Sequence, residues 1–113
     1  MKEIRAFVRA DAVHRVLSAL HECEHFPGVT LTSCQGERRG RGPGGKYVAT
    51  EDSLDFRAMC LMTVFCIDTA CDHLVSVIGK AAHTGNSGDG VIVVADIDRV
   101  VRIRSGEEQD SAV

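Results

Sequence analysis

The sequence lacks tryptophan and is poor in other large aromatics, with one tyrosine and four phenylalanines among 113 residues. A core must therefore be built from Val, Ile, Leu, Ala, Met and Cys. No apolar run approaches the roughly 20 residues that a membrane-spanning helix requires, so we expect no insertion into a membrane. The net charge of −3 does not favour nucleic acid as a partner.

The five cysteines form an odd count, which argues against a framework of disulfide bonds. Residues 1–5 carry no apolar stretch of the kind found in a secretory signal. Cys60 and Cys66 lie in an apolar run, where a thiol behaves as a small hydrophobic group. We therefore expect a cytoplasmic protein with a single domain over residues 1–113, because a chain of this length forms one domain.

The spacing of apolar residues predicts the element order β-α-β-β-α-β, which is the ferredoxin-like α+β fold with an antiparallel sheet. The expected strands are 2–9, 29–36, 58–67 and 91–95, with a short fifth strand at 100–104, a polar tail at 105–113, and helices capped by Asp11 and by Asp68 or Thr69. Two helices cover only one face of a sheet, yet strand 58–67 is apolar on both faces. A further copy of the chain is therefore expected on the other face.

Residues 37–57 break this pattern with the stretch Glu37-Arg-Arg-Gly-Arg-Gly-Pro-Gly-Gly-Lys46. Such a stretch cannot bury apolar surface, so we expect a mobile loop between the second and third strands. A loop of this length inside a small domain is usually functional. Its arginines could bind phosphate or nucleic acid, but no aromatic residues are interleaved for base stacking, and docking on a partner protein is favoured.

The strongest candidate for a binding site is Thr84-Gly-Asn-Ser-Gly-Asp-Gly90, with three glycines between a helix and a strand. Glycines let the backbone approach a ligand and present successive N–H groups to an anion. Arg102 and Arg104 would share one face of the last strand, where two guanidinium groups can grip phosphate. Taken alone, the glycine-rich segment could equally be an ordinary turn, and the arginines a solvated strand face.

The run Thr84-Gly-x-x-Gly-Asp-Gly-x-Ile-x-Val, followed by Arg102-Ile-Arg-Ser-Gly-Glu-Glu108, resembles the C-terminal signature of the PII nitrogen-regulatory family. Residues 1–8, Gly28-Val-Thr-Leu-Thr32 and Gly36 fit the same family, so the resemblance covers essentially the whole chain. It implies a divergent PII-like signalling protein, a homotrimer that binds ATP, ADP or AMP in clefts between subunits. Some family members hydrolyse ATP slowly, but the lack of a lysine at position 91 argues against efficient turnover, and we expect no enzyme. Loop 37–57 would correspond to the family's T-loop and dock on a target protein such as a transporter or a regulatory enzyme.

The resemblance also assigns the nucleotide contacts to positions of this sequence. The ribose and the adenine base would be held by Gly28, Thr30, Thr63, Val64 and Phe65, the last three through their backbone. The phosphates would be gripped by Gly36, Arg39, Gly88, Asp89, Gly90, Arg102 and Arg104.

Departures from the family pattern bear on the ligands. Val91 stands where the family usually has a lysine, which removes one phosphate cation and favours ADP or AMP over ATP. Gly40 replaces a glutamine that helps to place Mg-ATP and 2-oxoglutarate. At the end of the loop, Arg57 and Ala58 stand where a lysine would bind the carboxylate of the oxoacid. This change and Gly40 both argue against a response to 2-oxoglutarate. Asp52 falls where some members carry a modified tyrosine, which argues against nucleotidylylation there.

Two alternatives keep the fold and change the small-molecule effector. PII-like relatives without the oxoglutarate residues include regulators of bicarbonate or carboxysome functions and of metal efflux, and the cationic loop could bind bicarbonate beside ADP. The segment His21-Glu-Cys-Glu-His25 could bind zinc or copper, because residues 21 and 25 of a helix share a face. Cys71 and His73 form a weaker pair. Neither set has the four-ligand spacing of a structural zinc site, so we assign no metal.

Overall fold

The structure, a computed structural model, describes residues 1–37 and 56–113. The predictions made for Arg39, Gly40, Asp52 and the basic stretch 38–46 therefore concern residues outside the described part of the chain.

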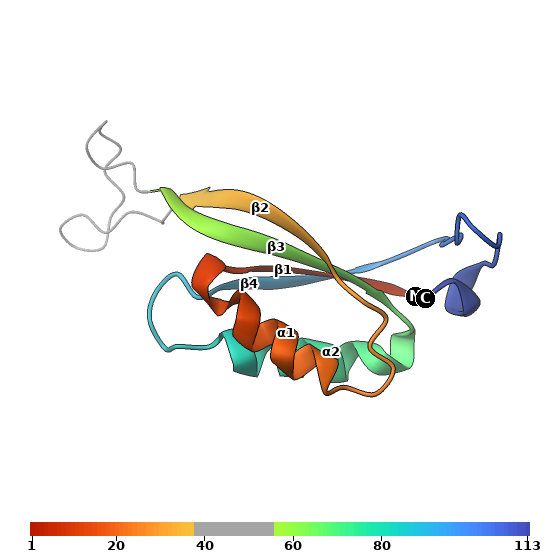
Figure 1. The fold of residues 1–113 in the computed structure, drawn as a ribbon, viewed down its shortest axis with the longest axis horizontal. Helices are drawn as coiled ribbons and strands as arrows, with labels where there is room; N and C mark the ends of the chain where they lie inside the picture. Colours follow the sequence, from red (N-terminus) through yellow and green to blue (C-terminus); the bar gives the residue numbers. More distant parts are fainter. Residues whose placement is uncertain (38–55) are drawn as a thin grey trace.

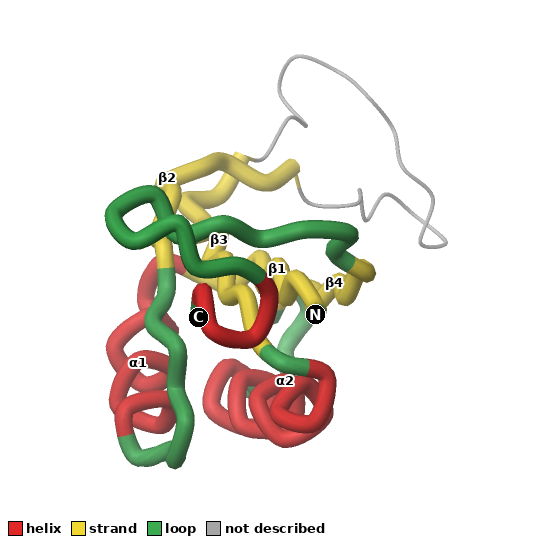
Figure 2. The backbone as a smooth tube through the Cα atoms, turned by 90° about the vertical axis from the view of Figure 1, so that its right-hand side faces the viewer, coloured by secondary structure: helices red, strands yellow, loops and turns green. Residues whose placement is uncertain are grey.

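Four antiparallel strands form one sheet in the order β2-β3-β1-β4, and two helices lie side by side on one of its faces (Figures 1 and 2). In chain order the elements are β1 (Lys2–Arg9), α1 (Val13–His21), β2 (Thr30–Glu37), β3 (Phe56–Cys66), α2 (Asp68–Ala82) and β4 (Gly90–Asp96). Short 3-10 turns precede α1 at Ala10–Ala12 and close the described chain at Gln109–Ala112. The predicted ferredoxin-like α+β fold is confirmed. Neither helix of the described residues has the length and apolar content that a membrane crossing needs.

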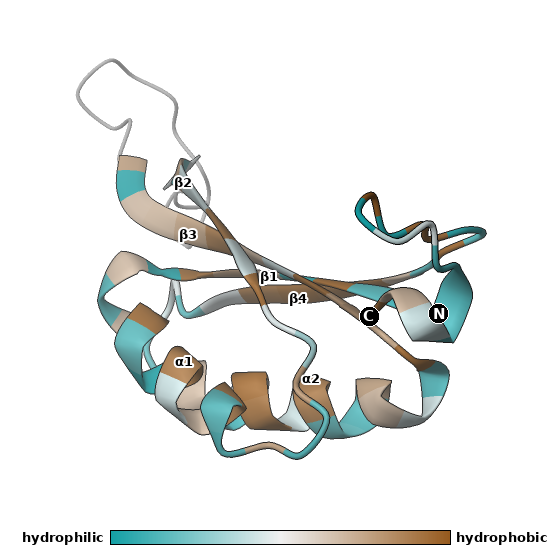
Figure 3. Ribbon diagram, turned by 45° about the vertical axis from the view of Figure 1, so that its right-hand side comes forward, coloured by the Kyte–Doolittle hydropathy of each residue, from teal (hydrophilic) through white to brown (hydrophobic). Residues whose placement is uncertain are grey.

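The core lies between the sheet and the helices. Alternate residues of β1 and β3 face the helices in register, so that Ile4 pairs with Val64 and Ala6 with Met62. Apolar stretches run along the strands and α2 (Figure 3). The helices add the buried side chains of Val16, Leu20, Leu74 and Ile78. Cys66 belongs to this core, as its apolar surroundings predict, and burial raises the pKa of its thiol to about 11.

The opposite face of the sheet carries no helix (Figure 2). The residues that alternate with the core positions point to this face, and many are apolar. Phe65 is 41% exposed, Val91 57% and Val93 41%. Phe7 pairs with both Leu61 and Val91, so the apolar surface continues across β3, β1 and β4. An apolar surface of this extent is typical of an interaction site.

The C-terminal segment differs from the prediction. Residues 100–104 were expected to form a strand, but only one isolated bridge forms, between Val101 and Glu108. Gly106 adopts φ +76° and its N–H donates to the carbonyl of Arg102 at 2.8 Å, so the chain turns back on itself. The expected polar tail also continues into the 3-10 turn, which buries Ala112. Arg102 and Arg104 therefore lie on a turn and not on one strand face.

The helix starts also differ from the prediction, because neither has a side-chain cap. Asp11 instead accepts a hydrogen bond from Arg9 at 3.1 Å, within the 3-10 turn before α1. Asp68 accepts one from the amino group of Met1 at 2.6 Å. Each carboxylate is thus paired with a cation, Asp11 with Arg9 and Asp68 with the amino group of Met1, and does not cap the helix. β1 has the predicted bounds, and those of the other three strands differ by one or two residues; β3 begins at Phe56, inside the segment predicted as loop.

Candidate functional site

The glycine-rich loop between α2 and β4 is held closed by Asp89. Its carboxylate oxygens accept hydrogen bonds from the backbone N–H of Thr84 at 2.7 Å, the backbone N–H of Gly85 at 3.0 Å, and the Thr84 hydroxyl. The N–H of Asn86 donates to the same hydroxyl oxygen at 3.2 Å. His83 places Nδ1 3.7 Å from Asp89 Oδ2. One side chain thus organises the whole turn.

These contacts lower the pKa of the Asp89 carboxyl to about 2, first through the hydrogen bond from the Thr84 side chain and next through that from its backbone. The group is therefore an anion at neutral pH. An anion turned into its own loop does not bind phosphate, since like charges repel. The Asp89 side chain accordingly shapes the loop in this geometry, and the backbone of residues 88–90 is what the resemblance leaves for an anion.

The glycines of the loop are required by backbone geometry. Gly88 has φ +90° and Gly90 has φ +115°, conformations that other L-residues rarely adopt. A Cβ atom on Gly90 would lie 1.8 Å from the backbone oxygen of Phe7. Gly90 therefore permits close packing of the loop against β1. The contact with the Phe7 carbonyl that requires a glycine here is visible only in the tertiary structure.

The groups assigned to the phosphates occupy two separate places in the chain. Gly88 and Gly90 lie where β4 begins, and Gly90 pairs with Val8 near the end of β1. Arg102 and Arg104 lie beyond Asp96, at the opposite end of β4 (Figure 1). Because a strand rises about 3.3 Å per residue, β4 alone separates the two groups by roughly 20 Å. One chain does not bring them to the same phosphates.

The remaining assigned residues divide in the same way. Gly36 pairs with Arg57 at the end of the sheet that carries the glycine-rich loop. Gly28, with φ +102° and no neighbouring atom where a Cβ would point, precedes β2 at the other end. Thr30 begins β2 and pairs with Thr63, toward the same end as Gly28.

The backbone of β3 beyond Thr63 has no partner in β2, whose pairing begins with Thr30. Val64 and Phe65 pair with β1 on their other side. The Val64 side chain is fully buried, whereas that of Phe65 is 41% exposed on the open face. The family resemblance assigns the backbone of residues 63–65, at this edge, to the adenine base.

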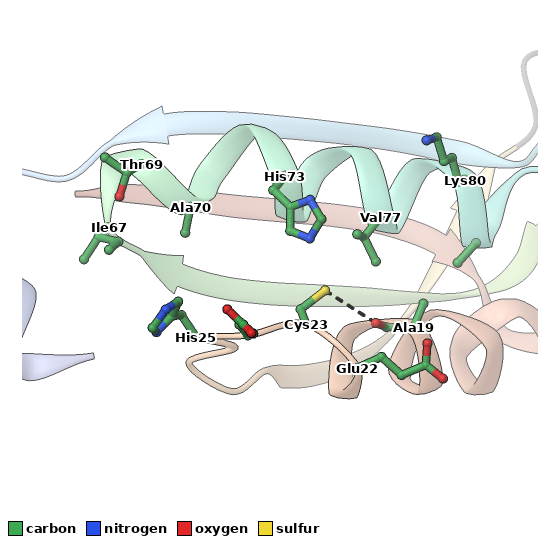
Figure 4. A pocket seen from close by; sticks show the side chains of 12 residues that line it. Ala19, Glu22, Cys23, His25, Ile67, Thr69, Ala70, His73, Val77 and Lys80 are labelled. Carbon is green, nitrogen blue, oxygen red and sulfur yellow. Dashed lines mark hydrogen bonds between the residues drawn. The ribbon is translucent and has the colours of Figure 1, made fainter.

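A separate hollow of about 880 Å³ lies between the end of α1 and α2, on the helical side of the molecule (Figure 4). His25 and His73 line it, and the Cys23 thiol donates to the carbonyl of Ala19 at 3.5 Å. Helix α1 ends at His21, so residues 21 and 25 do not share a helix face as the metal alternative required. Within residues 1–37 and 56–113, no group of three or more His, Cys, Asp or Glu side chains could hold a metal ion.

The family model for nitrogen regulatory protein P-II matches residues 1–107. The chain belongs to the P-II family. It is 35% identical to the nitrogen regulatory protein P-II of Azospirillum brasilense over the full length of both chains. Over the same full length it is 36% identical to nitrogen regulatory protein P-II 1 and 33% identical to nitrogen regulatory protein GlnK, both of Escherichia coli strain K12. This P-II protein is therefore a signalling regulator, as the resemblance predicted.

The close packing of Gly90 predicts an unusually costly substitution. Gly90→Ala should lower the free energy of unfolding by about 3 kcal/mol or more, because the new methyl group meets the Phe7 carbonyl and the backbone is strained. Gly106→Ala is the matched control. Gly106 also has positive φ, at +76°, but has no atom within 4 Å of its would-be Cβ, so the cost should be about 1–2 kcal/mol. Equal losses in urea unfolding would contradict this account of Gly90.

The hydrogen bonds to Asp89 predict a pH dependence of the loop. Because the folded-state pKa is lowered, the carboxylate stabilises the loop above its ordinary pKa, and this is lost as the pH falls from about 4 toward about 2. Thr84→Val removes one donor and should raise the pKa of Asp89 toward its ordinary value, read from the carboxyl carbon by NMR. Thr69→Val, on α2, should leave it unchanged. An unaltered titration in Thr84→Val would refute the assignment.

Proposed function

We propose that this P-II protein is a homotrimer that binds an adenine nucleotide in clefts between its subunits. The observation that carries the proposal is the separation of the two phosphate-binding groups by the length of β4. In the proposed assembly, the glycine-rich loop of one subunit meets Arg102 and Arg104 of the next. Gly28, Thr30 and the backbone of residues 63–65 would then hold the ribose and base on the arginine side of the cleft.

The open face of the sheet supports an assembly of identical chains. It presents Phe7, Leu61, Phe65, Val91 and Val93, and burial of such a surface is the main driving force of association. Closed rotational symmetry lets every copy bury the same surface without leaving an open end.

The C-terminal segment supports the same arrangement. Ile103, between the two arginines, is 100% exposed, and Val101 is 46% exposed. Isolated apolar side chains at a surface are common, but a fully exposed isoleucine between two cations fits a segment that packs on another subunit. In that setting Ile103 would be buried while Arg102 and Arg104 face the phosphates.

A nucleotide bound in the proposed cleft would act as a signal and would not be a substrate for hydrolysis. The pairing of β2 with β3 ends at Glu37 and Phe56, next to Gly36, so a ligand at this end of the sheet would contact the flanks of the segment assigned to target docking. A nucleotide that binds one arrangement of this segment more tightly changes the affinity for a target protein in the cytoplasm, such as a transporter or a regulatory enzyme.

The proposal predicts binding of ATP, ADP or AMP in calorimetric titration. Replacing both Arg102 and Arg104 by Ala should weaken binding by several kcal/mol, since each charge-assisted contact contributes about 1.5–3 kcal/mol. Arg15→Ala is the control, because Arg15 lies on α1 and donates to the carbonyl of Ala81 at 3.1 Å, on the helical side of the molecule.

Failure of the wild-type protein to bind any of the three nucleotides would overturn the proposal. An equal affinity of the double variant and Arg15→Ala would overturn the assigned role of the two arginines.

A further inference from the structure

The guanidinium group of Arg57 lies against the glycine-rich loop. A Cβ atom built on Gly88 would be 3.1 Å from Arg57 Nη1, so this cation lies beside Gly88 of the loop. The sheet register explains the approach. β1 ends at Arg9, which pairs with Met59, and β3 extends past that point by Arg57 and its neighbours. The long Arg57 side chain can therefore reach past the end of β1 to the loop.

The surroundings of Arg57 leave room for a ligand. A hollow of about 430 Å³ at this end of the sheet is lined by Arg9, Ala10, Asp11, Arg57 and Ala58. In this hollow Arg9 is paired with Asp11 at 3.1 Å, and Nη1 of Arg57 lies toward Gly88. A guanidinium group has five N–H donors, so Arg57 can take up an anion in addition to other hydrogen bonds.

The residue that follows the loop, Val91, is uncharged. Val91 follows Gly90 directly, pairs with Phe7 and exposes 57% of its surface on the open face of the sheet. A loop that presents N–H groups to phosphates without a nearby cation would compensate only part of their negative charge. Arg57 reaches the same loop from a different strand.

We propose that Arg57 is a phosphate-binding residue of this protein and supplies from β3 the cation that position 91 lacks. The inference rests on the nucleotide site proposed above and adds a residue to it. A planar guanidinium group binds two phosphate oxygens at once, which suits a di- or triphosphate. The site is thus built for ADP or ATP, in place of the preference for ADP or AMP that Val91 alone predicts.

Calorimetric titration of Arg57→Ala with ATP, ADP and adenosine tests the inference. The affinity for ADP and ATP should fall by about tenfold to a hundredfold, as expected for one charge-assisted contact, while that for adenosine should stay within about twofold. Arg57→Gln, measured in parallel, keeps most of the side chain and should show the same loss. Thermal unfolding of each variant establishes that it is folded.

Arg9→Ala is the matched control, since it removes an arginine that lines the same hollow and is paired with Asp11. Its affinity for ADP and ATP should stay close to that of the wild type. An unchanged affinity in Arg57→Ala, or an equal loss in Arg9→Ala, would overturn the role of Arg57 while leaving the nucleotide site intact. Absence of binding by the wild type would instead remove the proposed function and this inference together.

A rescue experiment separates charge from loop shape. Val91→Lys in the Arg57→Ala background places a cation beside Gly90 from β4 and should restore most of the lost affinity for ADP and ATP. If the double variant assembles like the wild type and stays as weak as Arg57→Ala, Arg57 acts on the shape of the loop and not on phosphate, and the proposal is wrong.

Discussion

The antiparallel pairing of β1 with β4 is the constraint on which the candidate site depends. At one end, Gly90 packs so closely on the Phe7 carbonyl that no side chain fits, and this fixes the glycine-rich loop. At the other end, the N–H of Ile97 donates to the carbonyl of Met1 at 3.1 Å, and the chain continues into the segment with the two arginines. The same ladder thus holds apart the two groups that we assign to the phosphates.

Because the two groups lie apart in one chain, an assembly through the open face of the sheet would be needed to bring them together. Burying Phe65, Val93 and their apolar neighbours against other copies would stabilise an assembly, and the same packing would bring complementary halves of the site together. Binding and assembly would then depend on each other, because a nucleotide held by two subunits also stabilises their interface. A cleft of this kind can transmit the state of the ligand to the flanks of residues 38–55.

Much of this could be read from the sequence, because apolar spacing identifies the helices and the main strands and glycines mark the loop. The strand expected at 100–104 alternates like a real one, but the turn at Gly106 pairs the segment with itself, which no local pattern shows. The inward carboxylate of Asp89 and the approach of Arg57 to Gly88 depend on tertiary contacts. The sequence identifies these residues as candidates, and only the fold distinguishes their roles.

Mixing subunits tests the central claim most directly. The double variant Arg102→Ala/Arg104→Ala lacks one half of the cleft, and Gly88→Asp, which adds a negative charge to the loop, lacks the other. Neither should bind ADP well alone. When the two chains are unfolded together in equal amounts and refolded, about one cleft in four should combine the intact halves and bind with wild-type affinity, as random assembly of a ring requires. No recovery of binding would show that the two halves do not act across a subunit boundary.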